Sequence, residues 1–232
     1  MDNFFKSYSK LDNLNVSRET FVDLEYFLNM ILEENKKINI LSRKNLKNIE
    51  IRERHIIDSA QIIDFVELNG KNITDIGSGG GMPGVVIAII LKNMKNDLKI
   101  NLFEKSYHKS RFLREVSRKL KLNIEVYQKN IFEVKKIQSG TIMSRAFKPM
   151  PIVLDLVYKN FYSFNNLILF MGQNGKKILK NSLKDWDLEY IEKKSITNKD
   201  SFLLNIKKIK KKLIWKLFLS SIKKAELAKQ LQ

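Results

Sequence analysis

Cysteine is absent from this sequence, and its absence excludes several kinds of chemistry. A chain without thiols forms no disulfide framework and no thiolate metal site, and it has no cysteine nucleophile. Histidine is almost as scarce, because His55 and His108 are the only two and lie far apart in the sequence. We therefore expect no metal centre. We also expect His55 to be packed or hydrogen-bonded locally in a helix and His108 to lie on a polar helix face, neither acting as a base.

Long hydrophobic runs are missing as well. No apolar stretch approaches the roughly 20 residues that a membrane-spanning helix requires. The first residues, Met1–Lys6, do not combine a basic region with an apolar stretch as a secretory signal would. We therefore expect a soluble, cytoplasmic protein. Its 232 residues suffice for one well-buried α/β domain with a smaller attachment, rather than for two full-sized domains.

Acidic residues are too few to balance the basic ones. Lys and Arg number 43 against 25 Asp and Glu, which leaves a net charge of +18 and a pI of about 9.8. A surplus of this size favours a polyanionic partner such as nucleic acid. An alternative stays open, because codon bias in an AT-rich genome would also enrich lysine on solvated faces.

Glycine is concentrated in one short segment. Residues 74–84 read TDIGSGGGMPG, directly after a short apolar run and directly before the apolar segment 85–91. Because glycine has no Cβ, such a loop turns tightly and brings backbone N–H groups against a ligand, and Pro83 suits the first turn of the following helix. A glycine loop between a strand and a helix predicts a nucleotide-type cofactor site at the carboxyl end of the first strand.

The hydrophobic pattern divides the chain into a helical part and an α/β part. In residues 1–70, Ser17 is a candidate N-cap for a helix that runs to about Leu32, and the apolar spacing over 49–66 indicates one or two further helices. Over 71–208, short strands alternate with helices, as in a parallel sheet covered on both faces. The expected strands are 72–76, 98–103, 123–127, 140–144 and 166–171, and the expected helices are 84–94, 107–121, 150–161 and 174–182.

The end of the chain departs from this alternation. Two strands without a helix between them are expected at 187–193 and 201–208, which implies an antiparallel hairpin at one edge of the sheet. Residues 209–232 then combine a lysine-rich run with an amphipathic basic helix that begins at Leu213. Two interpretations of this C-terminal helix stay open, an additional RNA contact and a solvated lysine face.

Three charged residues fall at the carboxyl ends of expected strands. Glu104 has the spacing of the acidic residue that hydrogen-bonds a cofactor ribose, although a carboxylate there also suits the start of the following helix. Asp75 either faces a positively charged cofactor or braces the glycine loop. A guanidinium at Arg145 can hold a cofactor carboxylate or an RNA phosphate, the alternative being a structural ion pair.

With these elements placed, the sequence resembles the RsmG (GidB) family of bacterial 16S ribosomal RNA guanine-N7 methyltransferases from about residue 20 to residue 206. Five segments carry the resemblance, namely NKKINIL (35–41), RHIIDS (54–59), DIGSGGGMPG (75–84), KSRFL (109–113) and SRAF (144–147). The glycine segment alone would indicate only a class I methyltransferase. Two features depart from the family, because Met171-Gly172 stands where members often have Lys-Gly, and few members continue into a basic C-terminal helix.

The resemblance implies a fold, a cofactor and a substrate. The fold is α/β, a mostly parallel Rossmann-like class I methyltransferase sheet over 71–208, and the cofactor is S-adenosylmethionine. The substrate is the guanine at position 527 of 16S ribosomal RNA, in free RNA or in the small ribosomal subunit, and we expect a monomer. Cofactor contacts carry over onto Gly77, Met82, Ile131, Phe132 and Arg145. The residue pattern itself adds Gly79 and Glu104 to the cofactor site.

The chemistry of this reaction agrees with what the sequence lacks. Guanine N7 carries a lone pair and no proton, so methyl transfer needs in-line positioning rather than a general base, and we assign no catalytic residue. Pyrimidine C5 methylation usually uses a cysteine. Amino-group methylation uses a loop of the Asn-Pro-Pro-Tyr type, whereas the prolines here are Pro83, Pro149 and Pro151.

Two other functions compete with this interpretation. A NAD-dependent Rossmann oxidoreductase shares the glycine loop and the acidic ribose residue, but the proton-handling residue and the substrate domain that it needs are not visible. A non-catalytic, basic RNA-binding or ribosome assembly factor is the second, and the intact glycine loop and Glu104 argue against it.

Overall fold

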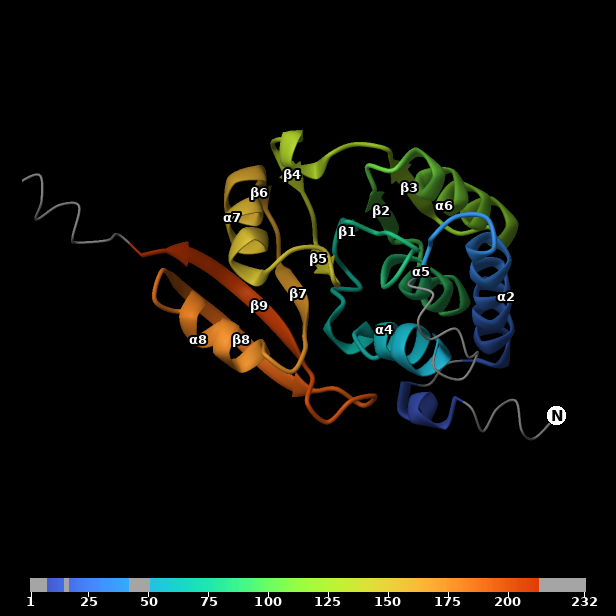
Figure 1. The fold of residues 1–232 in the computed structure, drawn as a ribbon, viewed down its shortest axis with the longest axis horizontal. Helices are drawn as coiled ribbons and strands as arrows, with labels where there is room; N and C mark the ends of the chain where they lie inside the picture. Colours follow the sequence, from blue (N-terminus) through green and yellow to red (C-terminus); the bar gives the residue numbers. More distant parts are fainter. Residues whose placement is uncertain (1–7, 15–16, 42–50, 213–232) are drawn as a thin grey trace, which may run out of the picture.

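A seven-stranded sheet organises the part of the chain that the computed structural model describes, residues 8–14, 17–41 and 51–212 (Figure 1). The strand order is β3-β2-β1-β5-β7-β9-β8, in which β9 runs antiparallel to both of its neighbours and the other pairs are parallel. The predicted mostly parallel sheet with an antiparallel edge hairpin is confirmed. The strands are β1 Asn72–Ile76, β2 Lys99–Phe103, β3 Ile124–Tyr127, β5 Thr141–Ser144, β7 Asn166–Met171, β8 Trp186–Lys194 and β9 Phe202–Lys211.

Helices cover both faces of this sheet. Because successive side chains of a strand point to opposite faces, Met143 packs into one core cluster and its neighbour Ile142 into another. The first cluster contains the apolar residues of α5 and α6, and the second contains those of α7 and α8. The bounds of these helices are α5 Gly84–Asn93, α6 Tyr107–Leu120, α7 Met150–Asn160 and α8 Gly175–Ser182.

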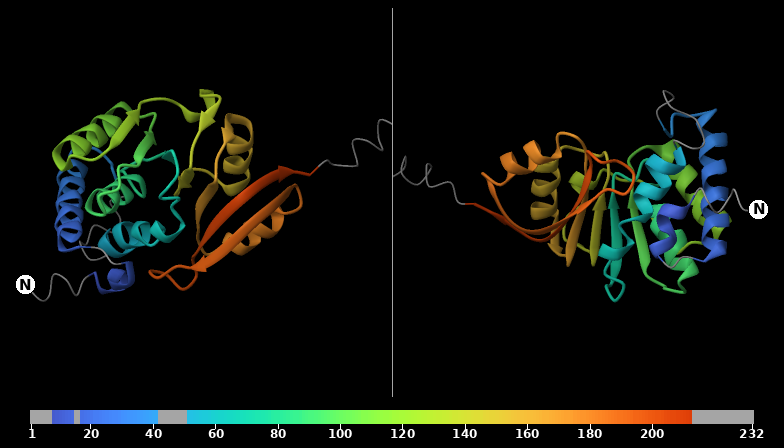
Figure 2. Two further views of the ribbon diagram at one scale, coloured as in Figure 1. Left: turned by 180° about the vertical axis from the view of Figure 1, so that it is seen from behind. Right: turned by 90° about the horizontal axis from the view of Figure 1, so that it is seen from below.

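The N-terminal helices share the first of these cores. Ser17 is the N-cap of α2, as predicted, and its hydroxyl accepts from the backbone N–H of Thr20. Phe27 and Ile31 of α2 are fully buried in the same cluster as the apolar face of α5. Figure 2 shows the N-terminal helices at one end of the sheet and the β8–β9 hairpin at the other. The N-terminal elements are η1 Ser9–Leu14, α2 Arg18–Asn35, η3 Arg52–Ile57, α4 Asp58–Ala60 and η4 Ile63–Phe65.

The structure differs from the predicted elements in three places. A second, two-stranded sheet pairs β4 (Ile137–Gln138) with β6 (Phe161–Ser163), and α7 ends before Phe161 because that residue is extended and belongs to β6. Residues 52–57 form a π-helical turn. Strand β9 continues to Lys211, so residues 209–211 of the lysine-rich run belong to the hairpin rather than to a separate C-terminal segment. The predicted helix over 213–232 lies outside the described residues.

The strand order creates one special point along the carboxyl edge of the sheet. From β1 the chain continues to β2 and β3 on one side, whereas β5 and β7 lie on the other side. The connections that leave the carboxyl ends of β1 and β5 therefore diverge, and open α/β sheets bind their ligands at such a switch point. The glycine loop, Glu104 and Arg145 all follow strands that end at this edge.

Candidate functional site

The glycine loop leaves β1 with a backbone that favours glycine. Gly77 has φ +70° and Gly79 has φ +55°, both in the left-handed region. A Cβ on Gly77 would lie 2.1 Å from Cδ2 of Phe147, so only glycine allows that ring to pack against the loop. A Cβ on Gly79 would make one ordinary contact, with the Gly77 carbonyl oxygen 3.8 Å away, and would clash with nothing. Gly79 therefore presents bare backbone to a ligand.

Asp75 links the two ends of this loop. Its Oδ2 accepts a hydrogen bond from the backbone N–H of Gly84 at 3.0 Å, which ties the end of β1 to the start of α5. Burial raises the pKa of the Asp75 carboxyl to about 7, against the lowering effect of the Gly84 hydrogen bond. Its Oδ1 is buried with no partner among the described residues. Of the two roles considered for Asp75, the hydrogen bond from Gly84 corresponds to bracing of the glycine loop.

Glu104 holds the other side of the loop. Its Oε2 accepts from the backbone N–H of Gly79 at 2.9 Å, and its Oε1 accepts from Ser106 at 2.7 Å, just before α6. The two interpretations of Glu104 are therefore compatible, because the carboxylate supports the start of α6 and also reaches the glycine loop. A carboxylate has about four acceptor positions, so each oxygen retains a lone pair for a ligand.

Five of the seven predicted cofactor-binding residues line a single cavity of about 490 Å³, which we call the loop cavity. They are Gly77, Gly79, Glu104, Ile131 and Phe132. Ile131 and Phe132 come from η5 (Ile131–Glu133), which is capped by the Asn130 side chain accepting from the Phe132 N–H. The Phe132 and Phe147 rings stack with their centroids 5.9 Å apart. The sequence-based prediction thus brings together residues from three separate loops at one site.

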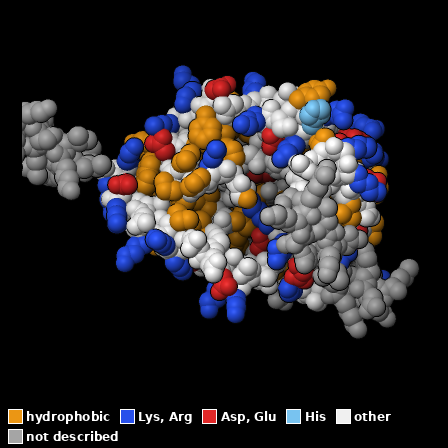
Figure 3. Space-filling view, viewed as in Figure 1, with side chains coloured by type: hydrophobic (Ala, Val, Ile, Leu, Met, Phe, Trp, Pro, Cys, Tyr) orange, Lys and Arg blue, Asp and Glu red, His pale blue; other side chains and the backbone are white. Residues whose placement is uncertain are grey.

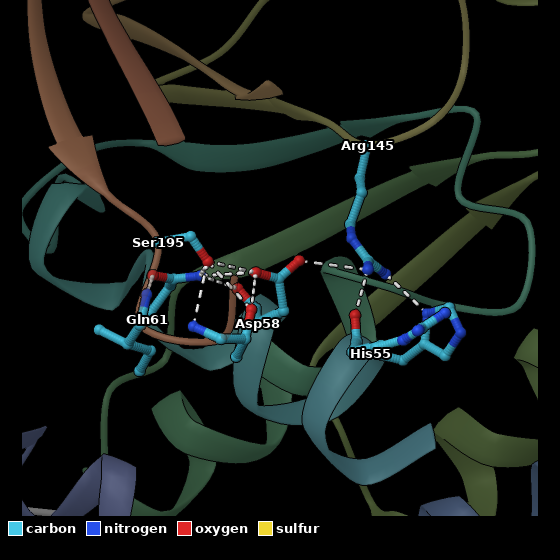
Figure 4. A network of polar contacts seen from close by, with 8 residues as sticks. His55, Asp58, Gln61, Arg145 and Ser195 are labelled. Carbon is cyan, nitrogen blue, oxygen red and sulfur yellow. Dashed lines mark hydrogen bonds and ion pairs between the residues drawn. The ribbon is translucent and has the colours of Figure 1, made fainter. Parts of the chain in front are cut away.

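Met82 and Arg145 are the two predicted residues that do not line the loop cavity. The Met82 side chain is buried, with 7% exposed, in the core cluster beneath α5. The Arg145 guanidinium turns instead toward the N-terminal helices, where it contacts the Asp58 carboxylate at 3.2 Å, Nδ1 of His55 at 3.0 Å and the backbone carbonyl of Arg54 (Figure 4). Arg145 thus makes the structural ion pair that was the alternative interpretation.

His55 belongs to this cluster as a neutral partner. Burial, with smaller contributions from Arg145 and Arg54, lowers the pKa of His55 to about 4. Its Nδ1 can then accept from Arg145, although the two residues are 90 positions apart. His55 is therefore hydrogen-bonded to a distant strand end, whereas the sequence suggested a local partner.

Comparison with known proteins identifies the family. A family model described as rRNA small subunit methyltransferase G matches residues 21–204. A protein named ribosomal RNA small subunit methyltransferase G from Pelagibacter ubique is 64% identical, over 91% of this chain and 100% of that protein. A protein of the same name from Ruegeria sp. (strain TM1040) is 32% identical, over 85% of this chain and 95% of that protein.

The chain belongs to the rRNA small subunit methyltransferase G family. It is therefore an enzyme of the rRNA methyltransferase class, which confirms the resemblance drawn from the sequence and removes support for a NAD-dependent oxidoreductase. The fold is also that of known methyltransferases. The 16S rRNA methylase RmtB superimposes with a TM-score of 0.50 at 12% identity, over 83% of this chain and 76% of that one. Another solved structure, a mutant of MtNAS in complex with S-adenosylmethionine, has a similar fold, with a TM-score of 0.53 at 13% identity over 88% of this chain and 83% of that one.

Two further cavities of this methyltransferase adjoin the loop cavity at Ala146. One of about 340 Å³ lies between α7 and α8. The other, of about 330 Å³, is lined by Asp58, Arg145 and residues of β7 and the β8–β9 hairpin. Figure 3 shows hydrophobic side chains gathered over α7 and β7 beside a central hollow. The segment after β5 therefore lines all three cavities.

The Asp58 carboxylate links this segment to the hairpin. Oδ1 of Asp58 accepts from Gln61 Nε2 at 2.7 Å, Thr197 Oγ1 at 2.8 Å and Ser195 Oγ at 3.2 Å, while Oδ2 pairs with Arg145 (Figure 4). One carboxylate therefore joins three chain segments around the methyltransferase site.

The sequence-based prediction missed several residues that line the loop cavity. Lys109 and Phe147 lie inside segments that carry the family resemblance, which was the available signal. Lys105, Lys129 and Lys148 also line the loop cavity, and nothing distinguishes them from the other lysines of a lysine-rich chain. None of the helices described is long and apolar enough to cross a membrane, and in the described ranges no group of three or more His, Asp or Glu side chains could hold a metal ion.

Proposed function

We propose that this protein transfers the methyl group of S-adenosylmethionine to N7 of a guanine in 16S ribosomal RNA, at position 527. The observation that carries the proposal is the loop cavity, in which residues from four loops meet at the switch point of the sheet in a chain of the rRNA small subunit methyltransferase G family. The net charge of +18 suits an RNA substrate. We further infer that the enzyme is monomeric and works in the cytoplasm.

The residues of the loop cavity fit S-adenosylmethionine. Gly79 lets a ligand approach the backbone closely, Gly77 lets the Phe147 ring pack against the loop, and the lone pairs left on Glu104 suit two ribose hydroxyls. Ile131 and Phe132 provide an apolar edge for the adenine ring. Met82 and Arg145 stay predicted contacts, and three contacts of the Arg145 guanidinium are already made within the protein.

Methyl transfer to N7 requires the protein mainly to position the guanine base and the cofactor. When bound, S-adenosylmethionine supplies a methyl group activated by its sulfonium. Guanine N7 attacks with its own lone pair and loses no proton, so the enzyme has to hold the base in line and at the right distance. Glu104 and the glycine loop would hold the cofactor, and the segment after β5 would lie beside both the cofactor and the base.

The test is to map the product. The protein, with S-adenosylmethionine, is incubated with small ribosomal subunits and with protein-free 16S RNA from a strain that lacks this gene, and 7-methylguanosine is then mapped. We expect modification at guanine 527 in at least one substrate and none without S-adenosylmethionine. Methylation of a different atom or position would contradict the proposal, and no methylation of either substrate would favour a non-catalytic RNA-binding role.

A further inference from the structure

The cavity between α7 and α8 combines apolar walls with polar side chains. We call it the α7–α8 cavity, and its volume is about 340 Å³. Met150, Met171 and Ile178 contribute apolar walls, while Lys148, Gln173 and Asn174 bring polar groups to the same lining. Small-molecule sites combine a mostly apolar wall with a few polar groups in this way.

Three polar side chains of this cavity have no partner in the described part of the chain. Among the described residues, the side chains of Lys148, Gln173 and Asn174 make no hydrogen bond or ion pair, and Gln173 and Asn174 are exposed. Asn174 occupies the N-cap position of α8, where an asparagine normally accepts from the helix, yet its side chain makes no capping hydrogen bond. Its amide therefore remains available to a ligand.

The charged groups in the neighbouring cavity beside Asp58 are not available to a ligand in the same way. The Asp58 carboxylate already accepts three hydrogen bonds and pairs with Arg145, so the charged groups there satisfy one another. A ligand base would have to displace these contacts. The α7–α8 cavity needs no such displacement.

The position of the α7–α8 cavity fixes what it can receive. Ala146 and Lys148 line both this cavity and the loop cavity, so ligands in the two cavities would meet at the same two residues. Methyl transfer requires the acceptor atom and the methyl donor to be neighbours. A base inside an RNA fold must also be swung out of its stack, and proteins that do this hold it between apolar side chains and hydrogen-bond its edge.

We propose that the α7–α8 cavity binds the target guanine base, swung out of the RNA, with the amides of Gln173 and Asn174 on its polar edge and Lys148 on the phosphate of the same nucleotide. This assignment rests on the proposed function. Each amide offers both a donor and an acceptor, which matches the N–H groups and the O6 carbonyl of guanine. The lysine is at the boundary between the two cavities, where the nucleotide backbone would enter.

Two kinds of variant test this site. Gly172 lines the cavity, and a Cβ built on it meets no atom within 4 Å, so Gly172→Trp should fold normally and fill the entrance. The double variant Gln173→Ala with Asn174→Ala removes the two amides without removing a helix cap. Asn181→Ala is the matched control, because Asn181 is an exposed amide on the same helix and lies outside the lining.

The readouts are kcat and KM for the RNA and the Kd for S-adenosylmethionine, measured by calorimetry. We expect kcat/KM for the RNA to fall about tenfold or more in the double variant, the factor for one or two lost hydrogen bonds, and further in Gly172→Trp. The Kd for S-adenosylmethionine should stay within about twofold of the wild type in both variants and the control.

The outcomes separate the two proposals. If the wild type produced no 7-methylguanosine, the proposed function itself would fail. If the wild type is active and both cavity variants keep the wild-type kcat/KM, the base is bound elsewhere while the function stands. An equal loss of S-adenosylmethionine affinity in the cavity variants would also overturn the assignment, because the cavity would then belong to the cofactor site.

Discussion

Replacing Asp58 with asparagine isolates the charge that holds Arg145. The two side chains are only 15% and 16% exposed, and Arg145 Nη2 lies 3.2 Å from Asp58 Oδ2. Asparagine keeps an oxygen for Gln61 and Thr197 but removes the counter-charge of a buried guanidinium. Breaking a buried pair by removing one partner costs roughly 3 to 5 kcal/mol, and the slight exposure of this pair favours the lower end, so we expect Asp58→Asn to lose about 3 kcal/mol of unfolding free energy.

Urea unfolding of four proteins measures this loss. The set is the wild type, Asp58→Asn, Arg145→Met and the double variant, in which no unpaired charge remains and part of the stability should return. Glu33→Gln is the control, because the Lys36–Glu33 pair is about 70% exposed and such pairs contribute at most about 1 kcal/mol. A loss below about 1 kcal/mol in Asp58→Asn, equal to that in the control, would refute the reasoning.

Four further predictions concern the cofactor site, its pH dependence and the tail. Gly79→Val places a branched side chain at φ +55° inside the loop cavity and should abolish S-adenosylmethionine binding, so a wild-type calorimetric affinity in the folded variant would exclude this loop as the site. Glu104→Ala should weaken cofactor binding by about 1.5 to 3 kcal/mol and RNA binding far less, with exposed Glu189→Ala as the control, and equal losses would count against the ribose assignment. Because burial raises the pKa of Asp75 to about 7, the native state keeps a proton that the unfolded chain releases near pH 4. The unfolding free energy should therefore fall by up to roughly 3 kcal/mol between pH 5 and 8. In urea titrations at several pH values, Asp75→Asn should lack this pH dependence, and an unchanged pH dependence in the variant would contradict the raised pKa. Removing residues 213–232 should make the fall of RNA affinity with salt concentration less steep, with little change in cofactor affinity. Parallel plots of log affinity against log salt for the full-length and shortened proteins would instead indicate that the tail is a solvated lysine face. The cut is placed after residue 212 because a cut after Ile206 would remove half of β9.

The positions of the main-sheet strands could be predicted because local signals agree with the fold. Buried parallel strands read as short apolar runs, and Ser17 and the glycine loop mark element boundaries with specific chemistry. The pairing of β4 with β6 could not be predicted, since strands of two and three residues are formed by tertiary neighbours rather than by their own pattern.

The candidate site was predictable where loops follow strands and unpredictable where distant segments meet. Glu104 and Gly79 are placed at the switch point by the sheet topology, which the alternating pattern reveals. The Arg145 guanidinium points to Asp58 because the N-terminal helices pack beside the end of β5, and a sequence without a fold does not state which of its carboxylates an arginine meets. The α7–α8 cavity likewise depends on how two helices lie relative to one another.

The hydrogen bonds of Asp58 carry a consequence for biosynthesis. They join a residue in the first third of the chain to Ser195 and Thr197, which are 137 and 139 positions later. A growing polypeptide can therefore complete its sheet up to β7 on the ribosome and still lack the hairpin loop that anchors Asp58 and Arg145. The hydrogen bonds of Asp58 to the hairpin loop should therefore form only after Ser195 and Thr197 have left the exit tunnel, later than the pairing of the strands up to β7.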